Sequence, residues 1–226
     1  MFKNQETQNP KDIDPIREWC MKRVKSSDTF IDCGAHIGRA SIPVIIKNKP
    51  RFSILIEATP ASAKILQDNS QKIKESYVII NKVAYSEKRN ITFTVPTDSH
   101  IQASLYDRFS PNKEMVEKIE METITIDDIL DEYEIKGDIV LKLDVELSEW
   151  FVWKGMKRHL KQFRDICMEF MPTIMQADAG VNPYEFIDDI RINGYDVLNL
   201  DGSIPNDRDI FNPKESKIDL YLKRQI

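Results

Sequence analysis

Short apolar runs rich in β-branched residues alternate with segments of helical spacing along most of the chain. Residues 29–32 (TFID), 53–58 (SILIEA) and 138–145 (DIVLKLDV) are such runs, and a helical segment follows each of the first two. This alternation predicts an α/β fold with a parallel sheet between two layers of helices. Residues 138–145 are the most uniformly apolar run, so we expect them to form a central strand that is buried on both faces.

A single folded domain is expected over residues 13–226, after a polar tail or linker over residues 1–12. The length of 226 residues suits one α/β domain. Apolar residues at helical spacing begin at Ile13, and Asp14 is the predicted N-cap of a flanking helix or lid. Residues 96–118 have no clear period, and a segment this long is expected to shape the mouth of a binding site.

Hydrophobic periodicity predicts the remaining elements. Helices are expected at residues 39–47, 62–74, 148–162 and 183–193. Further strands are expected at residues 77–85, 91–95, 121–126 and 165–171. Two last strands, at residues 196–201 and 217–224, are separated by a turn-rich segment and are expected to pair as an antiparallel edge hairpin.

Net charge and cysteine content narrow the classes of function. The formal charge of -5 and the pI near 5.4 argue against a partner bound through its phosphate backbone, so no nucleic acid partner is expected. Cys20, Cys33 and Cys167 are far apart and odd in number, which indicates reduced thiols in a cytoplasmic protein rather than disulfides or a zinc site. No stretch approaches the roughly 20 apolar residues of a membrane span.

The most distinctive local motif, residues 32–38 (DCGAHIG), follows the first predicted strand directly. Gly34 permits close approach of a backbone segment, and Gly38 permits close packing of the following helix. Backbone N–H groups at the start of that helix can bind a polar ligand. The motif lacks the G-x-G-x-x-G spacing of a dinucleotide pyrophosphate loop, which disfavours a dehydrogenase. The alternative interpretation of residues 32–38 is a tight turn that binds no ligand.

Glu57 ends the second predicted strand. An acid at the carboxyl edge of a parallel sheet can accept hydrogen bonds from both hydroxyls of a ribose. The alternative is an exposed acid that caps the helix beginning near Pro60. The glycine loop and this acid together favour a ligand site more strongly than either feature alone.

Residues 142–149 (KLDVELSE) and 153–156 (WKGM) stand out among several ordered segments. They resemble the K-I-D-V-E-G-A-E and L-K-G-A segments of the FkbM family of S-adenosylmethionine-dependent methyltransferases. The other similar segments are residues 30–38 (FIDCGAHIG), 56–60 (IEATP), 81–86 (NKVAYS), 103–105 (ASL) and 124–130 (ITIDDIL). Departures occur at Leu147 and Ser148, where the family usually has Gly and Ala, and at His36 and Ala58, where Asn and Pro are common.

The resemblance implies a class I methyltransferase fold, which is Rossmann-like and has a seven-stranded sheet of six parallel strands and one antiparallel strand near the edge. It also implies S-adenosylmethionine as the cofactor, with its amino acid part over residues 32–38, its ribose at Glu57 and its adenine beside residues 83–86. The residues that are expected to bind the cofactor are Asp32, Gly34, Ala35, His36, Gly38, Glu57, Ala58, Val83, Ala84 and Asp144.

Acidic side chains after the central strand are the main candidates for catalysis. Methyl transfer from a sulfonium is an in-line displacement, so the protein must align donor and acceptor and remove a proton from a hydroxyl acceptor. Asp144, Glu146 and Glu149 are candidates for this work, although helix capping or the helix dipole also explains acids at this place. His100 and His36 are further candidates because a neutral imidazole is a base near pH 7.

Glu169 lies near the end of another predicted strand, where its side chain is expected to face the same crevice as Asp144. It is interpreted as a structural acid, as a second acceptor-side carboxylate, or with Asp144 as a ligand for Mg²⁺, although the chain has no dedicated metal loop. Lys142 precedes Asp144 by two residues on the same face of the strand and is expected to pair with a nearby carboxylate.

These features favour an O-methyltransferase that acts on a hydroxyl of a sugar, a glycan or another small polar acceptor. The acceptor class follows from what the family commonly methylates, and a crevice lined by acids suits hydrogen bonding to a polyol. One alternative is a catalytically silent module that still binds the cofactor, which the departures at Leu147 and Ser148 make conceivable. Another is a nicotinamide-dependent oxidoreductase, which the missing third glycine disfavours.

Overall fold

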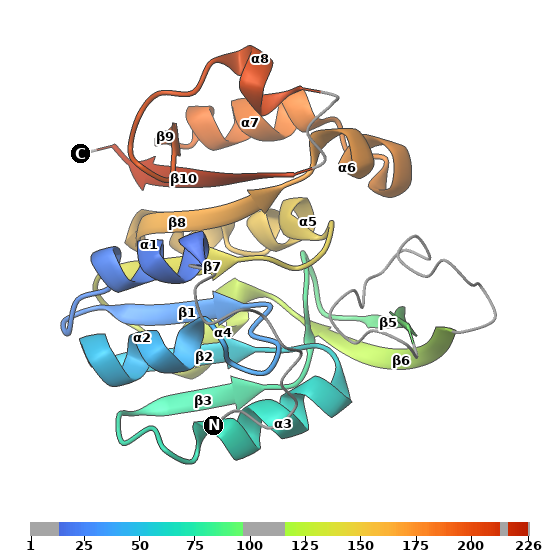
Figure 1. Cartoon of the computed structure of the whole chain (residues 1–226). Coiled ribbons are helices and arrows are strands. Elements are labelled where there is room, and N and C mark those ends of the chain that lie inside the picture. Colours follow the sequence, from blue (N-terminus) through green and yellow to red (C-terminus); the bar gives the residue numbers. More distant parts are fainter. Residues whose placement is uncertain (1–13, 97–115, 213–216, 226) are drawn as a thin grey trace.

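A seven-stranded sheet forms the centre of the molecule in the computed structural model, which describes residues 14–96, 116–212 and 217–225 (Figure 1). The strands follow the order β3-β2-β1-β7-β8-β10-β9 across the sheet. Their bounds are β1 (Thr29–Cys33), β2 (Phe52–Ile56), β3 (Tyr77–Ile80), β7 (Ile139–Leu143), β8 (Phe163–Phe170), β9 (Tyr195–Asn199) and β10 (Ile218–Arg224).

The strands from β3 to β8 pair in parallel, whereas β10 runs antiparallel to both β8 and β9. The expected sheet of six parallel strands and one antiparallel strand near the edge is therefore confirmed. The pairing of the last two strands is confirmed as well, with β9 at the edge and β10 inside it. Every residue of β7 is buried, as predicted for the central strand.

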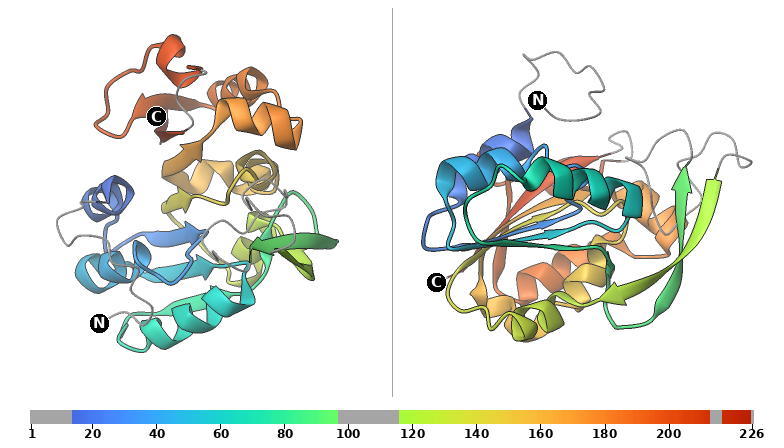
Figure 2. Two further views of the ribbon diagram at one scale, coloured as in Figure 1. Left: turned by 45° about the vertical axis from the view of Figure 1, so that its right-hand side comes forward. Right: turned by 90° about the horizontal axis from the view of Figure 1, so that it is seen from below.

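Helices cover both faces of this sheet (Figure 2). Helices α1 (Pro15–Arg23), α2 (Ser41–Asn48) and α3 (Pro60–Ser70) lie on one face, and α4 (Ile126–Glu132), α5 (Glu149–Lys154) and α7 (Pro183–Ile192) lie on the other. Successive residues of a strand point to opposite faces. Phe30 and Val140 accordingly pack with the first group of helices, and their neighbours Ile31 and Leu141 pack with the second.

Helix α1 begins where the sequence predicts it. The Asp14 side chain accepts hydrogen bonds from the backbone N–H groups of Ile16 and Arg17, at 3.0 and 3.1 Å. The buried side chains of Ile16, Trp19 and Cys20 belong to the apolar core on this face of the sheet. The helix therefore flanks the sheet, and only its first turn reaches the cavity described below.

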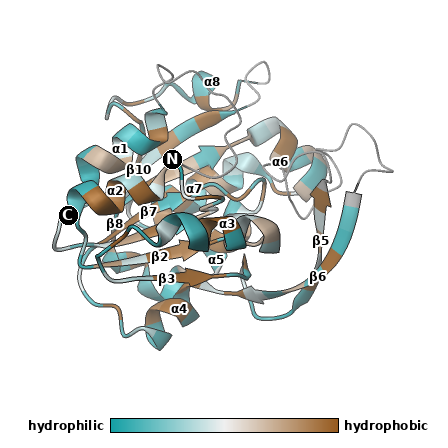
Figure 3. Cartoon of the chain, turned by 60° about the horizontal axis from the view of Figure 1, so that its bottom comes forward, coloured by the Kyte–Doolittle hydropathy of each residue, from teal (hydrophilic) through white to brown (hydrophobic). Residues whose placement is uncertain are grey.

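A second sheet of order β4-β6-β5 extends from the main sheet (Figures 1 and 2). Its strands are β4 (Val83–Ala84), β5 (Asn90–Pro96) and β6 (Val116–Ile124). Hydrophilic and hydrophobic residues alternate along β6 (Figure 3), and a small apolar core of Val83, Phe93 and Val95 lies against this sheet. The predicted strand at residues 121–126 is thus the end of a longer strand outside the main sheet.

The prediction of one continuous strand over residues 77–85 is wrong. Strand β3 ends at Ile80, and β4 pairs with β6 in the second sheet. At the break, the Asn81 amide donates hydrogen bonds to the backbone oxygens of Glu57 and Ala58, at 2.8 and 2.9 Å. These bonds redirect the chain after β3, and nothing in the apolar pattern of the segment reveals them.

Two helix predictions also need correction. The expected helix over residues 148–162 is split into α5 and a 3₁₀-helix, η2 (Lys157–Gln162). Gly155 lies at the break, where an added Cβ would come within 2.1 Å of the backbone oxygen of Tyr85. The segment after β8 was expected to be a loop but contains α6 (Pro172–Ala179), and a short α8 (Asp207–Ile210) precedes β10. None of the helices in the described ranges has the length and apolar character that crossing a membrane requires.

Candidate active site

A cavity of about 360 Å³ opens at the carboxyl ends of β1, β2 and β7, between the main sheet and the second sheet. This edge is where open α/β sheets bind ligands, and the volume falls within the range of roughly 300–1,000 Å³ typical of small-molecule sites. Its lining includes these residues of the predicted site: Gly34, Ala35, His36, Glu57, Ala58, Val83, Ala84, Asp144 and Glu146. Asp32, Gly38 and Glu149 are buried behind the lining, and His100 lies outside the described residues.

The glycine loop is shaped by its packing against the rest of the protein. Gly34 has a φ of +88°, and an added Cβ would lie 1.7 Å from the backbone oxygen of Asp144. Gly38 has a φ of +85°, and an added Cβ would lie 2.4 Å from the Cδ1 atom of Ile42. Gly38 therefore permits close helix packing, as predicted. At Gly34 the predicted close backbone approach is made by the protein's own turn after β7, a partner that the motif does not identify.

A buried ion pair ties this loop to the central strand. Lys142 Nζ lies 3.0 Å from Asp32 Oδ1, 3.0 Å from the backbone oxygen of Gly34 and 3.3 Å from Asp144 Oδ2. Burial lowers the pKa of Lys142, but the charges of Asp32 and Asp144 outweigh it and raise the pKa overall. The expected pairing of Lys142 with a carboxylate is confirmed. Asp32 acts here by holding Lys142 and the loop in position.

Glu57 is buried beside the glycine loop, with 7% of its surface exposed. Its Oε2 accepts a hydrogen bond from the His36 backbone N–H, and its Oε1 accepts one from the Thr59 backbone N–H, both at 2.8 Å. Burial raises the pKa of this carboxyl, and the two backbone donors oppose the shift. Glu57 bonds to Thr59, the N-cap of α3, but it is buried and lines the cavity, so it is not the exposed capping acid of the alternative interpretation.

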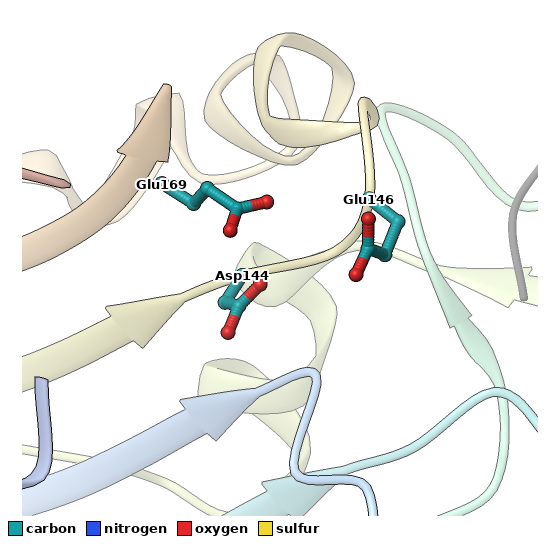
Figure 4. A group of neighbouring side chains, drawn as sticks. All are labelled: Asp144, Glu146 and Glu169. Carbon is teal, nitrogen blue, oxygen red and sulfur yellow. The ribbon is translucent and has the colours of Figure 1, made fainter. Parts of the chain in front are cut away.

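Three acids converge at the end of the central strands (Figure 4). Asp144 and Glu146 come from the turn after β7, Glu169 comes from the end of β8, and one carboxylate oxygen of each lies within 4.8 Å of the others. Glu146 and Leu147 both have positive φ values, of 53° and 78°. The side chain of Leu147 is completely buried, so a residue with a large side chain adopts here a conformation that favours glycine.

Burial and repulsion between neighbouring carboxylates make two of these acids, Glu146 and Glu169, weaker than usual. Burial, together with the charges of Glu169 and Asp144, raises the pKa of Glu146 from 4.5 to about 8. Burial and the charge of Asp144 raise the pKa of Glu169, although Lys217 forms an ion pair with its Oε1. Glu146 is thereby suited to accept a proton near neutral pH.

Glu149 occupies a different position from the other predicted catalytic acids. Its side chain is 1% exposed, and its Oε1 accepts a hydrogen bond from the backbone N–H of Val145 at 3.0 Å. Burial and the charge of Glu169 raise its pKa. This contact braces the turn that carries Asp144 and Glu146, and it gives Glu149 a positioning role in the geometry of the site.

Lys217 and Phe93 are among the cavity residues that the sequence did not predict. Lys217, which precedes β10, pairs with Glu169, and Phe93 of the second sheet forms part of the wall. No motif surrounds Lys217 in the sequence, and only the antiparallel insertion of β10 beside β8 brings it here. Phe93 lies on β5, which was predicted as a strand, but the sequence did not show that this strand lies beside the cavity.

The domain model described as "Methyltransferase FkbM domain" matches residues 32–197. This match spans the glycine loop, Glu57 and the three converging acids, so the family resemblance of the motifs is confirmed over most of the chain. No match to the chain is found among curated proteins.

Solved structures of similar fold include methyltransferases. The precorrin-6y C5,15-methyltransferase of Geobacter metallireducens is 12% identical, with a TM-score of 0.51 and coverage of 100% of this chain and 97% of its own. A TehB-like SAM-dependent methyltransferase of Corynebacterium glutamicum is 9% identical, with a TM-score of 0.51 and coverage of 95% and 89%. These likenesses establish the class I, Rossmann-like methyltransferase fold.

Proposed function

The chain belongs to the FkbM methyltransferase family, and we propose that it transfers a methyl group from S-adenosylmethionine to a hydroxyl group of a sugar, a glycan or another small polar acceptor. The observation that carries this proposal is the group of acids at the cavity, led by Asp144 and by Glu146 with its pKa of about 8. S-adenosylmethionine supplies an electrophilic methyl group on a sulfonium sulfur. A hydroxyl that attacks this methyl group must lose its proton, and a carboxylate with a raised pKa is a suitable base.

The cavity has the features that an adenosyl cofactor requires. The Glu57 carboxylate accepts backbone hydrogen bonds from His36 and Thr59 and a further bond from the Thr59 side chain. A carboxylate has about four acceptor positions, so one remains for a ribose hydroxyl. Val83 and Ala84 offer apolar surface for the adenine ring. The glycine loop over residues 34–36 lines the same cavity as these residues and Asp144, which supports the expected place for the amino acid part.

The acidic side of the cavity supports a hydroxylated acceptor of low negative charge. Carboxylates accept hydrogen bonds from hydroxyl groups, and they repel the phosphates of a nucleic acid. We therefore propose a polyol, and not a nucleic acid, as the acceptor. The silent cofactor-binding module and the oxidoreductase become outcomes of the test that follows.

Calorimetric titration with S-adenosylhomocysteine tests the cofactor part of the proposal. We expect the wild-type chain to bind it and Glu57→Gln to bind about 10- to 100-fold more weakly, because hydrogen bonds to a charged group contribute about 1.5–3 kcal/mol. Glu132→Gln, which changes an exposed acid of α4, is the matched control and should bind like the wild type. Binding of NAD(H) instead would favour the oxidoreductase.

Methyl transfer from labelled S-adenosylmethionine to a panel of sugars and glycans tests the acceptor part. We expect label in a hydroxyl of at least one acceptor and a much lower rate in Asp144→Asn. Binding of the cofactor without transfer to any sugar, glycan, amine or RNA acceptor would favour the silent module. Transfer to an amine or to RNA alone would refute the O-methylation of a polyol.

A further inference from the structure

The three converging acids have the spacing of a cation site. One carboxylate oxygen each of Asp144, Glu146 and Glu169 lies within 4.8 Å of the others, and Figure 4 shows the side chains directed toward a common region. Two ligands on opposite sides of a divalent cation, each about 2.1–2.5 Å from it, are at most about 4–5 Å apart. The separations of up to 4.8 Å are close to this limit, so small side-chain movements would let one cation contact all three oxygens.

Glu169 adds an independent sign of a missing ligand. Its side chain is 3% exposed, and Lys217 contacts its Oε1 only. The other oxygen, Oε2, is buried and has no hydrogen-bond partner among the described residues. Buried polar atoms in native proteins nearly always have a partner. A buried carboxylate oxygen without one, on a side chain that faces two other acids, points to a bound cation.

Charge balance around the three acids favours the same ligand. Lys142, which is shared between Asp32 and Asp144, and Lys217 contact acids of this region, and Arg39 and Lys82 line the same cavity. At least six carboxylates gather here, those of Asp32, Asp144, Glu146, Glu149, Glu169 and Asp219. Repulsion between charges is strong where water is excluded, and a divalent cation would offset much of the excess.

We propose that Asp144, Glu146 and Glu169 bind a divalent cation of the oxygen-seeking class, such as Mg²⁺ or Mn²⁺. The class follows from the donors, because the group contains carboxylates and neither His nor Cys. Three protein ligands leave coordination positions open toward the cavity that Asp144 and Glu146 line.

Titration of the full chain with Mn²⁺, followed by electron paramagnetic resonance, tests the cation site directly. We expect one bound Mn²⁺ per chain, displaced by excess Mg²⁺. Glu169→Gln and Asp144→Asn should each weaken binding by about 10- to 100-fold, the range found when metal sites lose supporting groups. Glu132→Gln should leave the affinity unchanged. Lys217→Met, which removes a competing positive charge, should bind Mn²⁺ more tightly than the wild type.

Absence of Mn²⁺ binding by a chain that is folded by circular dichroism would overturn the proposal. Equal binding by the wild type and both acid variants would overturn it as well, and so would weaker binding by Lys217→Met. Calorimetry with S-adenosylhomocysteine on the same preparations separates the two proposals. Binding of that ligand without Mn²⁺ binding refutes the cation site alone, whereas Mn²⁺ binding without it refutes the proposed function alone.

Discussion

Lys142 is a cation buried between two strands, and its ammonium group contacts oxygen atoms of Asp32, Gly34 and Asp144. Each contact comes from a different place in the chain, so this one side chain joins β1, the glycine loop and the turn after β7. Such a pair adds little net stability over an apolar pair of equal volume, but removal of one partner leaves an uncompensated buried charge. The geometry of the site therefore depends on an intact ion pair between Lys142 and Asp32.

We therefore predict that Lys142→Met lowers the free energy of unfolding by about 3–5 kcal/mol, because Asp32 loses its buried counter-ion. The double variant Asp32→Asn with Lys142→Met should recover most of this loss. Urea unfolding measures both changes. Lys82→Met, which breaks the exposed pair with Glu122, is the control and should change stability only slightly. A double variant as unstable as the single one would contradict the argument.

Ionisation of the Glu146 carboxyl destabilises the folded state in a pH-dependent way. Its pKa is raised from 4.5 to about 8 in the folded protein, so the folded state binds this proton more tightly than the unfolded chain does. The free energy of unfolding then decreases as the pH rises from 4.5 to about 8. Above the folded-state pKa the full destabilisation by the ionised Glu146 is present.

We predict that Glu146→Gln raises the Tm by about 2–8 °C at about pH 9 and has little effect at about pH 4. Scanning calorimetry in the presence of EDTA measures the change without a bound cation. The exposed Glu132→Gln should give no pH-dependent difference. An equal change in Tm for Glu146→Gln at both pH values would show that ionisation of Glu146 does not cause the destabilisation.

At the scale of elements, the loop after β1 and the turn after β7 are built as one unit. Gly34 packs against the Asp144 carbonyl, and the backbone N–H of Asp144 donates a hydrogen bond to Cys33 O at 3.0 Å. Glu149 holds the same turn from the start of α5. Consecutive positive φ values at Glu146 and Leu147 then turn one acid toward the cavity while the Leu147 side chain enters the core.

We predict that Gly34→Ala destabilises the protein by more than about 3 kcal/mol, because its Cβ would overlap the Asp144 carbonyl and no flexible atom can yield. Gly194→Ala is a matched control. Gly194 has a φ of +85° but nothing within 4 Å of its added Cβ, so this variant should cost only the conformational strain of about 1–2 kcal/mol. Equal losses in chemical denaturation would mean that strain alone, and not close packing, requires Gly34.

At the scale of the whole molecule, the cavity exists because two sheets meet. The main sheet supplies the glycine loop, Glu57, Asp144 and Glu146, and the second sheet supplies Val83, Ala84 and Phe93. A ligand that fills this space contacts both sheets. Its binding energy therefore adds to the stability of the complete fold rather than to one element.

We predict that S-adenosylhomocysteine at about 100 times its Kd raises the Tm by about 5–10 °C, since ligand binding at this excess adds about 2.7 kcal/mol to the free energy of unfolding. NAD(H) at the same concentration should leave the Tm unchanged. Differential scanning fluorimetry measures both effects. A shift with NAD(H) and none with the adenosyl ligand would contradict the assignment of the cavity.

Much of the fold was predictable because its signals are local. Strand and helix periodicity, the Asp14 cap and the glycine loop each depend on residues a few positions apart, and each is present in the structure. The break after Ile80 was not predictable, because Asn81 turns the chain by bonding to backbone atoms of a distant loop. The break at Gly155 likewise depends on the backbone of Tyr85, which lies far away in sequence.

The sequence by itself determined the fold class, the family and the set of candidate acids, because hydrophobic period and ordered motifs are properties of neighbouring residues. Only the tertiary structure decided the roles of those acids. It buried Asp32 against Lys142, sent Glu149 beneath the turn, and joined Glu169 with Asp144 and Glu146 beside the cavity. These outcomes depend on which strands become neighbours and on two positive φ values, and sequence spacing specifies neither.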